Sequence, residues 1–228
     1  MSNRWVESVK KNLLPLSKEK TDLNQALSEW FYTGDTYDLT RPEEDCELCD
    51  HPGIRFQFEI KNQHTKEVVL IGSECILRFS ISAIDDEGNV LDQVSTTKKV
   101  HQDRRKLISN ARTKRVITSL VDLSQKDKEF DDINNSIEYF QERGAFSPRH
   151  LLFLLWRMKK SGVSFNKTDF KMTIRRNREK DQLLAMKDWE VRKIKPAMSA
   201  AQQKWYQENG KPHDCSKNKC FFYSVSFG

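Results

Sequence analysis

The chain has 228 residues, of which 32% are charged and 37% hydrophobic, and its formal net charge is +6. Apolar residues recur throughout, which excludes a disordered chain, and the length fits one large domain or two small ones. The N-terminus lacks the pattern of a signal peptide, and the longest apolar run, residues 151–156, is too short to cross a bilayer. We therefore expect a cytoplasmic protein with no membrane partner.

Helical spacing marks the first segment of the chain, residues 2–32. Apolar residues recur there at intervals of three and four, in two runs that Pro15 separates. Thr21 or Asp22 is a suitable N-cap for the second run, which we expect to continue to Tyr32 and to end at Gly34. Residues 33–45 are polar and acidic, so residues 1–45 are predicted to form a helical arm and a loop.

The period of the pattern changes to two in the next segment, residues 46–97. Apolar residues alternate with polar ones in a first predicted strand, at Ile54, Phe56, Phe58 and Ile60. Residues 62–65 fit a turn, and residues 68–71 fit a second strand that ends at Gly72. A short helix near Cys75, with Ser73 as its cap, completes the predicted β-hairpin module.

Three cysteines are placed where this module would bring them together. Cys46 and Cys49 form a Cys-x-x-Cys pair, whose spacing lets both thiolates bind one tetrahedral Zn²⁺ at about 2.3 Å from each sulfur. The hairpin returns the chain to this pair and places Cys75 at a helix start, where the helix dipole favours a thiolate. Because cytosolic thiols stay reduced, we predict a zinc site rather than a disulfide.

The fourth zinc ligand has several candidates. His51, two residues after the Cys-x-x-Cys pair, is the predicted one, and His64 in the hairpin turn is the second candidate. Cys215 and Cys220, near His213, are the third, and they require the C-terminus to fold back. The alternatives to a metal site are buried thiols and a redox pair.

The string Cys-Glu-Leu-Cys-Asp-His-Pro-Gly-Ile-Arg-Phe, followed by Ile-Gly-Ser-Glu-Cys-Ile-Leu-Arg-Phe, resembles a module of uncharacterised bacterial and phage proteins. Those proteins pair a Cys-x-x-Cys with a later Gly-Ser-x-Cys. The resemblance covers residues 46–79. It implies a zinc-binding module of treble-clef or zinc-ribbon type in a protein of bacterial or phage origin, and it brings no activity with it.

Residues 98–228 are predicted to form a basic, mostly helical domain. A helix over residues 101–121 is expected to turn these residues inward: Leu107, Ile108, Ala111, Ile117, Leu120 and Val121. A second helix ends near Gly144, and Ser147-Pro148 begins a third, whose residues 151–158 are expected in the core. Residues 182–209 look helical with a break near Pro196, and residues 221–225 fit a final strand. The predicted class is α+β and mostly helical, a small zinc-bound β-hairpin module followed by a helical C-terminal part.

Basic residues gather in residues 98–121 and again in residues 171–180. Side chains on these faces are candidates for phosphate contacts, which give salt-dependent affinity that does not depend on base sequence. The predicted nucleic-acid-binding residues are Arg104, Arg105, Arg112, Lys114, Arg115, Arg175, Arg176 and Arg178. The alternative is a solvated face whose charges pair with the acidic residues 127–142.

The aromatic residues of the second half divide by context. Phe153 and Trp156 lie in the apolar run and are expected in the core. Trp189, Trp205 and Tyr206 lie in basic, amphipathic surroundings, where they suit stacking on bases or on a partner protein.

No motif of a known enzyme class is present. The sequence contains no phosphate-binding loop, dinucleotide fingerprint or nucleophile elbow, and no His-x-Glu precedes the Cys-x-x-Cys as in zinc deaminases. We therefore expect neither an enzyme nor a small-molecule substrate. The leading interpretation is a zinc-stabilised protein that binds DNA or RNA or acts as a regulator. The alternative is a protein-interaction module, such as a phage-encoded modulator of a host or defence protein.

Overall fold

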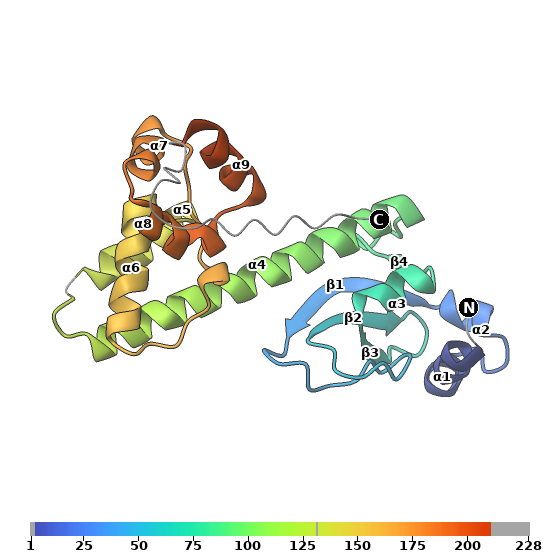
Figure 1. Cartoon of the computed structure of the whole chain (residues 1–228). Coiled ribbons are helices and arrows are strands. Elements are labelled where there is room, and N and C mark those ends of the chain that lie inside the picture. Colours follow the sequence, from blue (N-terminus) through green and yellow to red (C-terminus); the bar gives the residue numbers. More distant parts are fainter. Residues whose placement is uncertain (1–2, 131, 211–228) are drawn as a thin grey trace, which may run out of the picture. The chain divides into compact units, whose positions relative to one another are not determined.

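The computed structural model describes residues 3–130 and 132–210 as a mixed α+β protein with one small sheet and many helices (Figure 1). The predicted α+β class, with a small sheet followed by a mostly helical C-terminal part, is confirmed. The chain divides into two compact units, Met1–Arg112 and Thr113–Gly228, and the boundary falls inside the long helix α4 (Gln93–Lys126). His213, Cys215, Cys220 and the predicted strand over residues 221–225 lie outside the described residues.

Unit 1 begins with the two helical runs that the sequence predicts. They are α1 (Asn3–Leu13), which a 3₁₀ turn η1 (Leu14–Leu16) follows at Pro15, and α2 (Leu23–Leu27). The Asp22 side chain caps α2 by accepting hydrogen bonds from the N–H groups of Asn24 and Gln25 at 2.8 and 3.1 Å. The expectation that this helix continues to Tyr32 is wrong, because strand β1 (Trp30–Asp38) begins directly after it.

The sheet has four strands in the order β3-β2-β1-β4. The predicted hairpin is β2 (Phe56–Asn62) and β3 (Val68–Ile71), and the Asn62 side chain closes its turn by accepting from the His64 and Thr65 N–H groups. β1 pairs antiparallel with β2, and the two-residue β4 (Ser82–Ala83) pairs parallel with β1. The predicted loop over residues 33–45 therefore contains most of a central strand.

The core of unit 1 joins both ends of the unit to the hairpin. Trp30 and Tyr32 of β1 are buried beside Phe58 and Ile60 of β2. Helix α1 adds Val9 and Leu13 to this core, and α4 adds Val100 and Leu107. The structure therefore places residues 1–45 and the start of α4 in one compact unit with residues 46–97.

Helix α4 contributes to the cores of both units, but its buried positions do not follow one period. Leu107 and Ala111 are four residues apart, whereas five residues separate Ala111 from Val116, where the buried positions of unit 2 begin. Five residues place the next buried side chain on a different face of an α-helix. The expectation that Ile108 and Val121 turn inward is accordingly wrong, since they are 40% and 39% exposed.

Unit 2 is mostly helical in the part that the structure describes, with one isolated parallel β-bridge between Phe146 and Met172. After α4 its elements are α5 (Ile133–Arg143), α6 (Pro148–Lys160), η2 (Lys167–Asp169), α7 (Asn177–Leu184), α8 (Asp188–Ile194), η3 (Lys195–Ala197) and α9 (Ala200–Asn209). Helix α5 ends at Gly144 in the left-handed conformation, with φ of 65°, and α6 begins at Pro148 after Ser147, both as predicted. No helix among the described residues is both long enough and apolar enough to span a membrane.

Helix α6 is the predicted core helix of unit 2. Its fully or nearly fully buried side chains are Leu151, Leu154, Leu155 and Met158. These four positions fill the inward face, so Phe153 and Trp156 point away from the core and are 41% and 47% exposed. The expectation that both of these rings are core residues is wrong.

Candidate metal centre and charged surfaces

The sulfur atoms of Cys46, Cys49 and Cys75 all lie within 4.8 Å of one another. Cys46 Sγ is 3.7 Å from Cys75 Sγ, which is 3.3 Å from Cys49 Sγ, so the three are thiols rather than a disulfide pair. Tetrahedral zinc with bonds of 2.3 Å holds its sulfur ligands about 3.8 Å apart. The three buried sulfurs come together as predicted, at a spacing that can hold a metal ion.

The loop carrying Cys46 and Cys49 is a tight turn held by main-chain hydrogen bonds. The Cys46 N–H donates to the His51 carbonyl, and the Asp50 N–H donates to the Cys46 carbonyl, both at 2.9 Å. Asp50 adopts a φ of 56°, a left-handed conformation that aspartate tolerates better than most residues. Leu48, between the two cysteines, is fully buried. The turn is therefore anchored in the core of unit 1, with its sulfurs pointing inward.

Cys75 reaches the same place from helix α3 (Ser73–Arg78), which follows β3. The helix is capped at Gly72 rather than at Ser73, which is instead the first helical residue. The Gly72 N–H donates to Cys46 Sγ at 3.5 Å. The turn after β3 thus contributes both a third sulfur and a polar contact to the first one.

The thiols are electrostatically unequal. A hydrogen bond from the Cys75 thiol, helped by main-chain N–H groups that include Gly72, outweighs burial and lowers the pKa of Cys46 to about 5. The same hydrogen bond and burial raise the pKa of Cys75, and burial raises the pKa of Cys49. A divalent cation would replace the remaining protons, because metal-bound cysteines are thiolates.

Of the two histidines predicted as ligands, His51 lies near the cysteine turn and His64 lies in the hairpin turn. The His51 ring stacks on Trp5, with centroids 6.0 Å apart, and Arg78 lies 3.9 Å from the centroid of the same Trp5 ring. His64 is exposed in the β2–β3 turn. Among residues 3–130 and 132–210, no histidine or carboxylate joins the three cysteines.

Helix α1 covers the cysteine turn, which the sequence did not indicate. The Asn12 side-chain amide donates to the Leu48 carbonyl at 3.4 Å and to the Asp50 carboxylate at 2.8 Å. Together with the stacking of Trp5 on His51, these contacts make the N-terminal helix part of the surroundings of the candidate metal centre.

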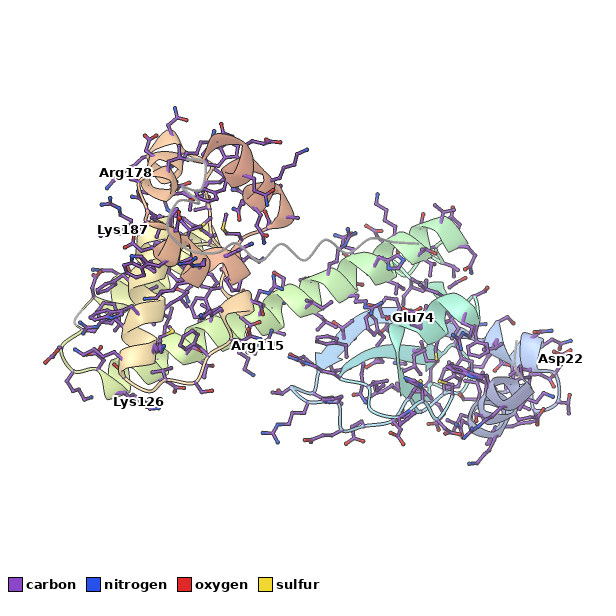
Figure 2. All side chains as sticks on the ribbon, viewed as in Figure 1. Asp22, Glu74, Arg115, Lys126, Arg178 and Lys187 are labelled. Carbon is purple, nitrogen blue, oxygen red and sulfur yellow. The ribbon has the colours of Figure 1, made fainter. Side chains whose placement is uncertain are left out.

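Two of the arginines predicted to bind nucleic acid are engaged in ion pairs. Arg104 contacts Glu74 of α3 at 2.9 Å, and Arg115 donates two hydrogen bonds to the Asp169 carboxylate at 2.8 and 2.7 Å; Figure 2 labels Glu74 and Arg115. Arg112 is half-buried. Asp169 is nearly buried, so its pair gives Arg115 a structural role in unit 2, whereas both side chains of the Arg104–Glu74 pair in unit 1 are exposed.

Other cations remain exposed. Lys98, His101 and Arg105 recur at intervals of three and four on the exposed side of α4, and Lys106 lies beside them. None of the three lysines and arginines in this set forms an ion pair with any residue that the structure describes. Lys114 is exposed too. Lys114 belongs to unit 2, where Arg175, Arg176 and Arg178 are also exposed, around the start of α7; Figure 2 labels Arg178.

The two C-terminal aromatics with a predicted surface role are partly buried. Trp205 and Tyr206 pack against the core of unit 2, and Lys180 Nζ lies 5.6 Å from the Trp205 ring centroid. Trp189 is 46% exposed, in keeping with the expected surface position. Compared with models of known protein families, with curated proteins and with solved structures, the chain matches none, so the proposals that follow rest on its own residues.

Proposed function

We propose that this protein is a zinc-stabilised nucleic-acid-binding protein. The observation that supports it most is a positive face of α4 whose charges no acidic side chain of the described residues neutralises. This face consists of Lys98, His101, Arg105 and Lys106. The only acidic residue of residues 98–121 is Asp103, and it points elsewhere. Its carboxylate accepts a hydrogen bond from the Tyr32 hydroxyl at 2.8 Å and lies 3.8 Å from Lys99 Nζ. The face of α4 therefore offers cations without a local counter-charge, as a phosphate backbone requires.

Zinc is the metal that best suits the candidate centre. Buried thiolates at tetrahedral spacing select zinc over the harder divalent cations, which prefer oxygen. When bound, zinc would cross-link the turn before β2 to the helix after β3, and such structural sites contribute folding free energy directly. We propose His51 as the fourth ligand, because it follows Cys49 by two residues and its main chain is already fixed to Cys46.

The metal would act on the nucleic-acid face through packing. Helix α3 carries Cys75, and its Glu74 contacts Arg104 of α4. Val100 and Leu107 bury the opposite side of α4 in the core of unit 1. Holding α3 in place therefore holds α4 against the sheet, with Lys98 and Arg105 facing solvent. Under this proposal zinc has a structural role, and the cations provide the binding.

The test is a binding titration with labelled DNA and RNA of random sequence, single-stranded and duplex, over a series of salt concentrations. The variant reverses three cations of the α4 face: Lys98→Glu, Arg105→Glu and Lys106→Glu. A matched control reverses three exposed lysines elsewhere in unit 1: Lys11→Glu, Lys61→Glu and Lys66→Glu. Both variants change the net charge equally, so a difference between them reports position rather than total charge.

We expect the native protein to bind with a steep salt dependence. Each lost phosphate contact reduces the slope of log K against log salt by about 0.7 to 0.9, so the α4 variant should lose about two units or more of slope. The control should retain most of the native slope. Absence of binding by the zinc-loaded native protein at low salt, or equal losses in both variants, would refute the proposal.

A further inference from the structure

Unit 2 has an open pocket between helices α6 and α8, with a volume of about 490 Å³. Its size falls within the range of about 300 to 1,000 Å³ that is usual for small-ligand sites. The residues that line it are Arg149, Leu152, Phe153, Trp156, Ala185, Met186, Trp189, Glu190 and Lys193. The lining thus combines large aromatic rings with cations, and it contains a single carboxylate.

The exposure of its three rings sets this pocket apart. Phe153, Trp156 and Trp189 are each more than 40% exposed, and among the described residues Tyr37 is the one other large aromatic that is similarly exposed. Single apolar side chains on a surface need no explanation, but aromatics gathered in one hollow mark a binding site. Because α6 already fills its buried face with leucines and Met158, these rings are not core residues displaced by poor packing.

Every one of the three rings has a cation near it. Lys193 Nζ lies 4.3 Å from the Trp189 ring centroid, Lys160 Nζ lies 5.6 Å from that of Trp156, and Arg157 Cζ lies 5.8 Å from that of Phe153. Cations this close to a ring are attracted to its face. Arg157 and Lys160 are themselves ion-paired, with Asp127 and with Glu129, so Lys193 beside Trp189 is the cation of the three that also lines the pocket.

The charges at the pocket favour an anionic occupant. Arg149 and Lys193 line it, whereas the carboxylate of Glu190 accepts a hydrogen bond from the Lys187 N–H at 2.8 Å and so serves to cap α8. Arg157, which is outside the lining, is paired with the buried Asp127 at 2.7 Å. The side chains left to meet a ligand's charge are thus cationic.

We propose that this pocket receives unstacked bases of a single-stranded nucleic acid, with Trp156 and Trp189 as stacking surfaces and Arg149 and Lys193 as phosphate contacts. The inference rests on the proposed function and adds the class of nucleic acid to it. Stacking on aromatic side chains beside cations is the usual mode of single-strand binding. A duplex keeps its bases inside, so it can meet the cations but cannot enter between the rings.

The test compares a labelled oligodeoxythymidine with a duplex of the same length, using the full chain. The variant is Trp156→Ala with Trp189→Ala, and the conservative variant is Trp156→Phe with Trp189→Phe, which keeps aromatic faces. Tyr37→Ala removes an exposed ring outside the pocket and serves as the control. A further variant, Arg149→Glu with Lys193→Glu, leaves the rings in place and tests the phosphate contacts.

We expect the double alanine variant to bind oligodeoxythymidine at least about tenfold more weakly, since one stacked base contributes about that much or more. Its affinity for the duplex should change little, and the phenylalanine variant should retain most of its single-strand affinity. The variant with reversed pocket charges should also lose single-strand affinity, and circular dichroism should show native helix content in each case.

The outcomes separate this inference from the proposed function. If single strand and duplex bind alike, and the alanine variant binds both as well as the native protein does, the pocket assignment is overturned while the α4 face still accounts for binding. If neither nucleic acid binds at low salt, the proposed function itself fails. Binding of an acidic amphipathic peptide that is lost in the alanine variant, without single-strand binding, would overturn the inference in favour of a protein partner.

Discussion

Arg115→Ala should destabilise unit 2 and leave nucleic-acid binding intact. Arg115 donates two hydrogen bonds to Asp169 of the 3₁₀ helix η2, and the side chain of Asp169 is only 11% exposed. Truncating the arginine leaves a nearly buried carboxylate without those two donors. The perturbation therefore separates a structural cation from the exposed cations that the proposed function requires.

The magnitude follows from the burial of the two partners. Removing one member of a fully buried ion pair costs about 3 to 5 kcal/mol, whereas exposed pairs contribute about 0 to 1 kcal/mol. The Arg115 side chain is 44% exposed and Asp169 is nearly buried, so this pair lies between those limits. We expect a loss of about 2 kcal/mol in the free energy of unfolding. For a unit of this size that corresponds to a fall in Tm of roughly 8 °C.

Differential scanning calorimetry and hydrogen exchange measure this effect on the full chain. Exchange should accelerate in peptides that cover residues 146–184 and stay unchanged in peptides that cover the sheet of unit 1. Arg175→Ala is the matched control, because Arg175 is exposed and forms no ion pair with the residues that the structure describes. Native stability of Arg115→Ala, accompanied by a shallower salt dependence of binding, would refute the reasoning and make Arg115 a phosphate contact.

Three further changes test the metal centre, a buried carboxylate and a helix end. Cys49→Ser should reduce the metal content measured by mass spectrometry from about one zinc per chain to none and should raise hydrogen exchange over residues 46–79. A metal-free native protein with the same stability as the variant would contradict this prediction. Burial acts to raise the pKa of Glu29, but hydrogen bonds from the Asn62 amide and from two main-chain N–H groups outweigh it and lower this pKa. The stabilisation by the Glu29 carboxylate is therefore present above the unfolded pKa of about 4.3 and is lost as pH falls through the folded pKa. Glu29→Gln should lower the free energy of unfolding by about 2 kcal/mol at neutral pH and weaken the dependence of stability on pH in acid. An unchanged dependence on acid pH would contradict this prediction. Gly144→Ala should lower the free energy of unfolding by about 1 to 2 kcal/mol, because φ is 65° there. An added Cβ meets no atom within 4 Å, so this cost comes from the backbone conformation alone. A thermal melt equal to that of the native protein would show that the backbone is unstrained.

The parts of the fold that the sequence predicts well are those with short-range signals. The alternation from Ile54 to Ile60, the Asn62 turn and the Cys-x-x-Cys spacing all lie within a few residues, and the hairpin and the three sulfurs follow from them. The start of α6 at Pro148 and the end of α5 at Gly144 have equally local causes. In each case the backbone conformation that the residue favours is the one that the structure contains.

Strand β1 shows why a neighbouring segment was mispredicted. Leu23, Leu27, Trp30 and Phe31 have helical spacing, yet the helix stops at Leu27. From Trp30 onward the chain pairs with β2. The partner of Trp30 is Asn62, 32 positions away, and that of Tyr32 is Ile60, 28 positions away, and this pairing buries both Trp30 and Tyr32. Strand formation depends on such cross-strand packing more than on intrinsic preference, so a local pattern does not predict it.

Long distances in sequence also separate Arg104 and Arg115 from the carboxylates that pair with them. Glu74 lies 30 residues before Arg104, and Asp169 lies 54 residues after Arg115, so neither pair is visible as a charge pattern. Asp103 lies within the basic run, and its carboxylate contacts one cation of that run, Lys99, together with the Tyr32 hydroxyl. Only the three-dimensional pairing shows which cations are available to a ligand.

A chain with 39 basic and 33 acidic residues has a small net charge, but its ability to bind a polyanion depends on where the unpaired cations lie. On α4 the unpaired cations lie on the side away from the sheet of unit 1, and the exposed rings of α6 and α8 lie beside further cations in unit 2. Under the two proposals, a duplex uses only the first kind of surface, whereas a single strand uses both kinds. Two results would therefore distinguish this arrangement from a generally basic protein. The affinity should rise when a duplex is melted, and it should fall to the duplex value when Trp156 and Trp189 are removed.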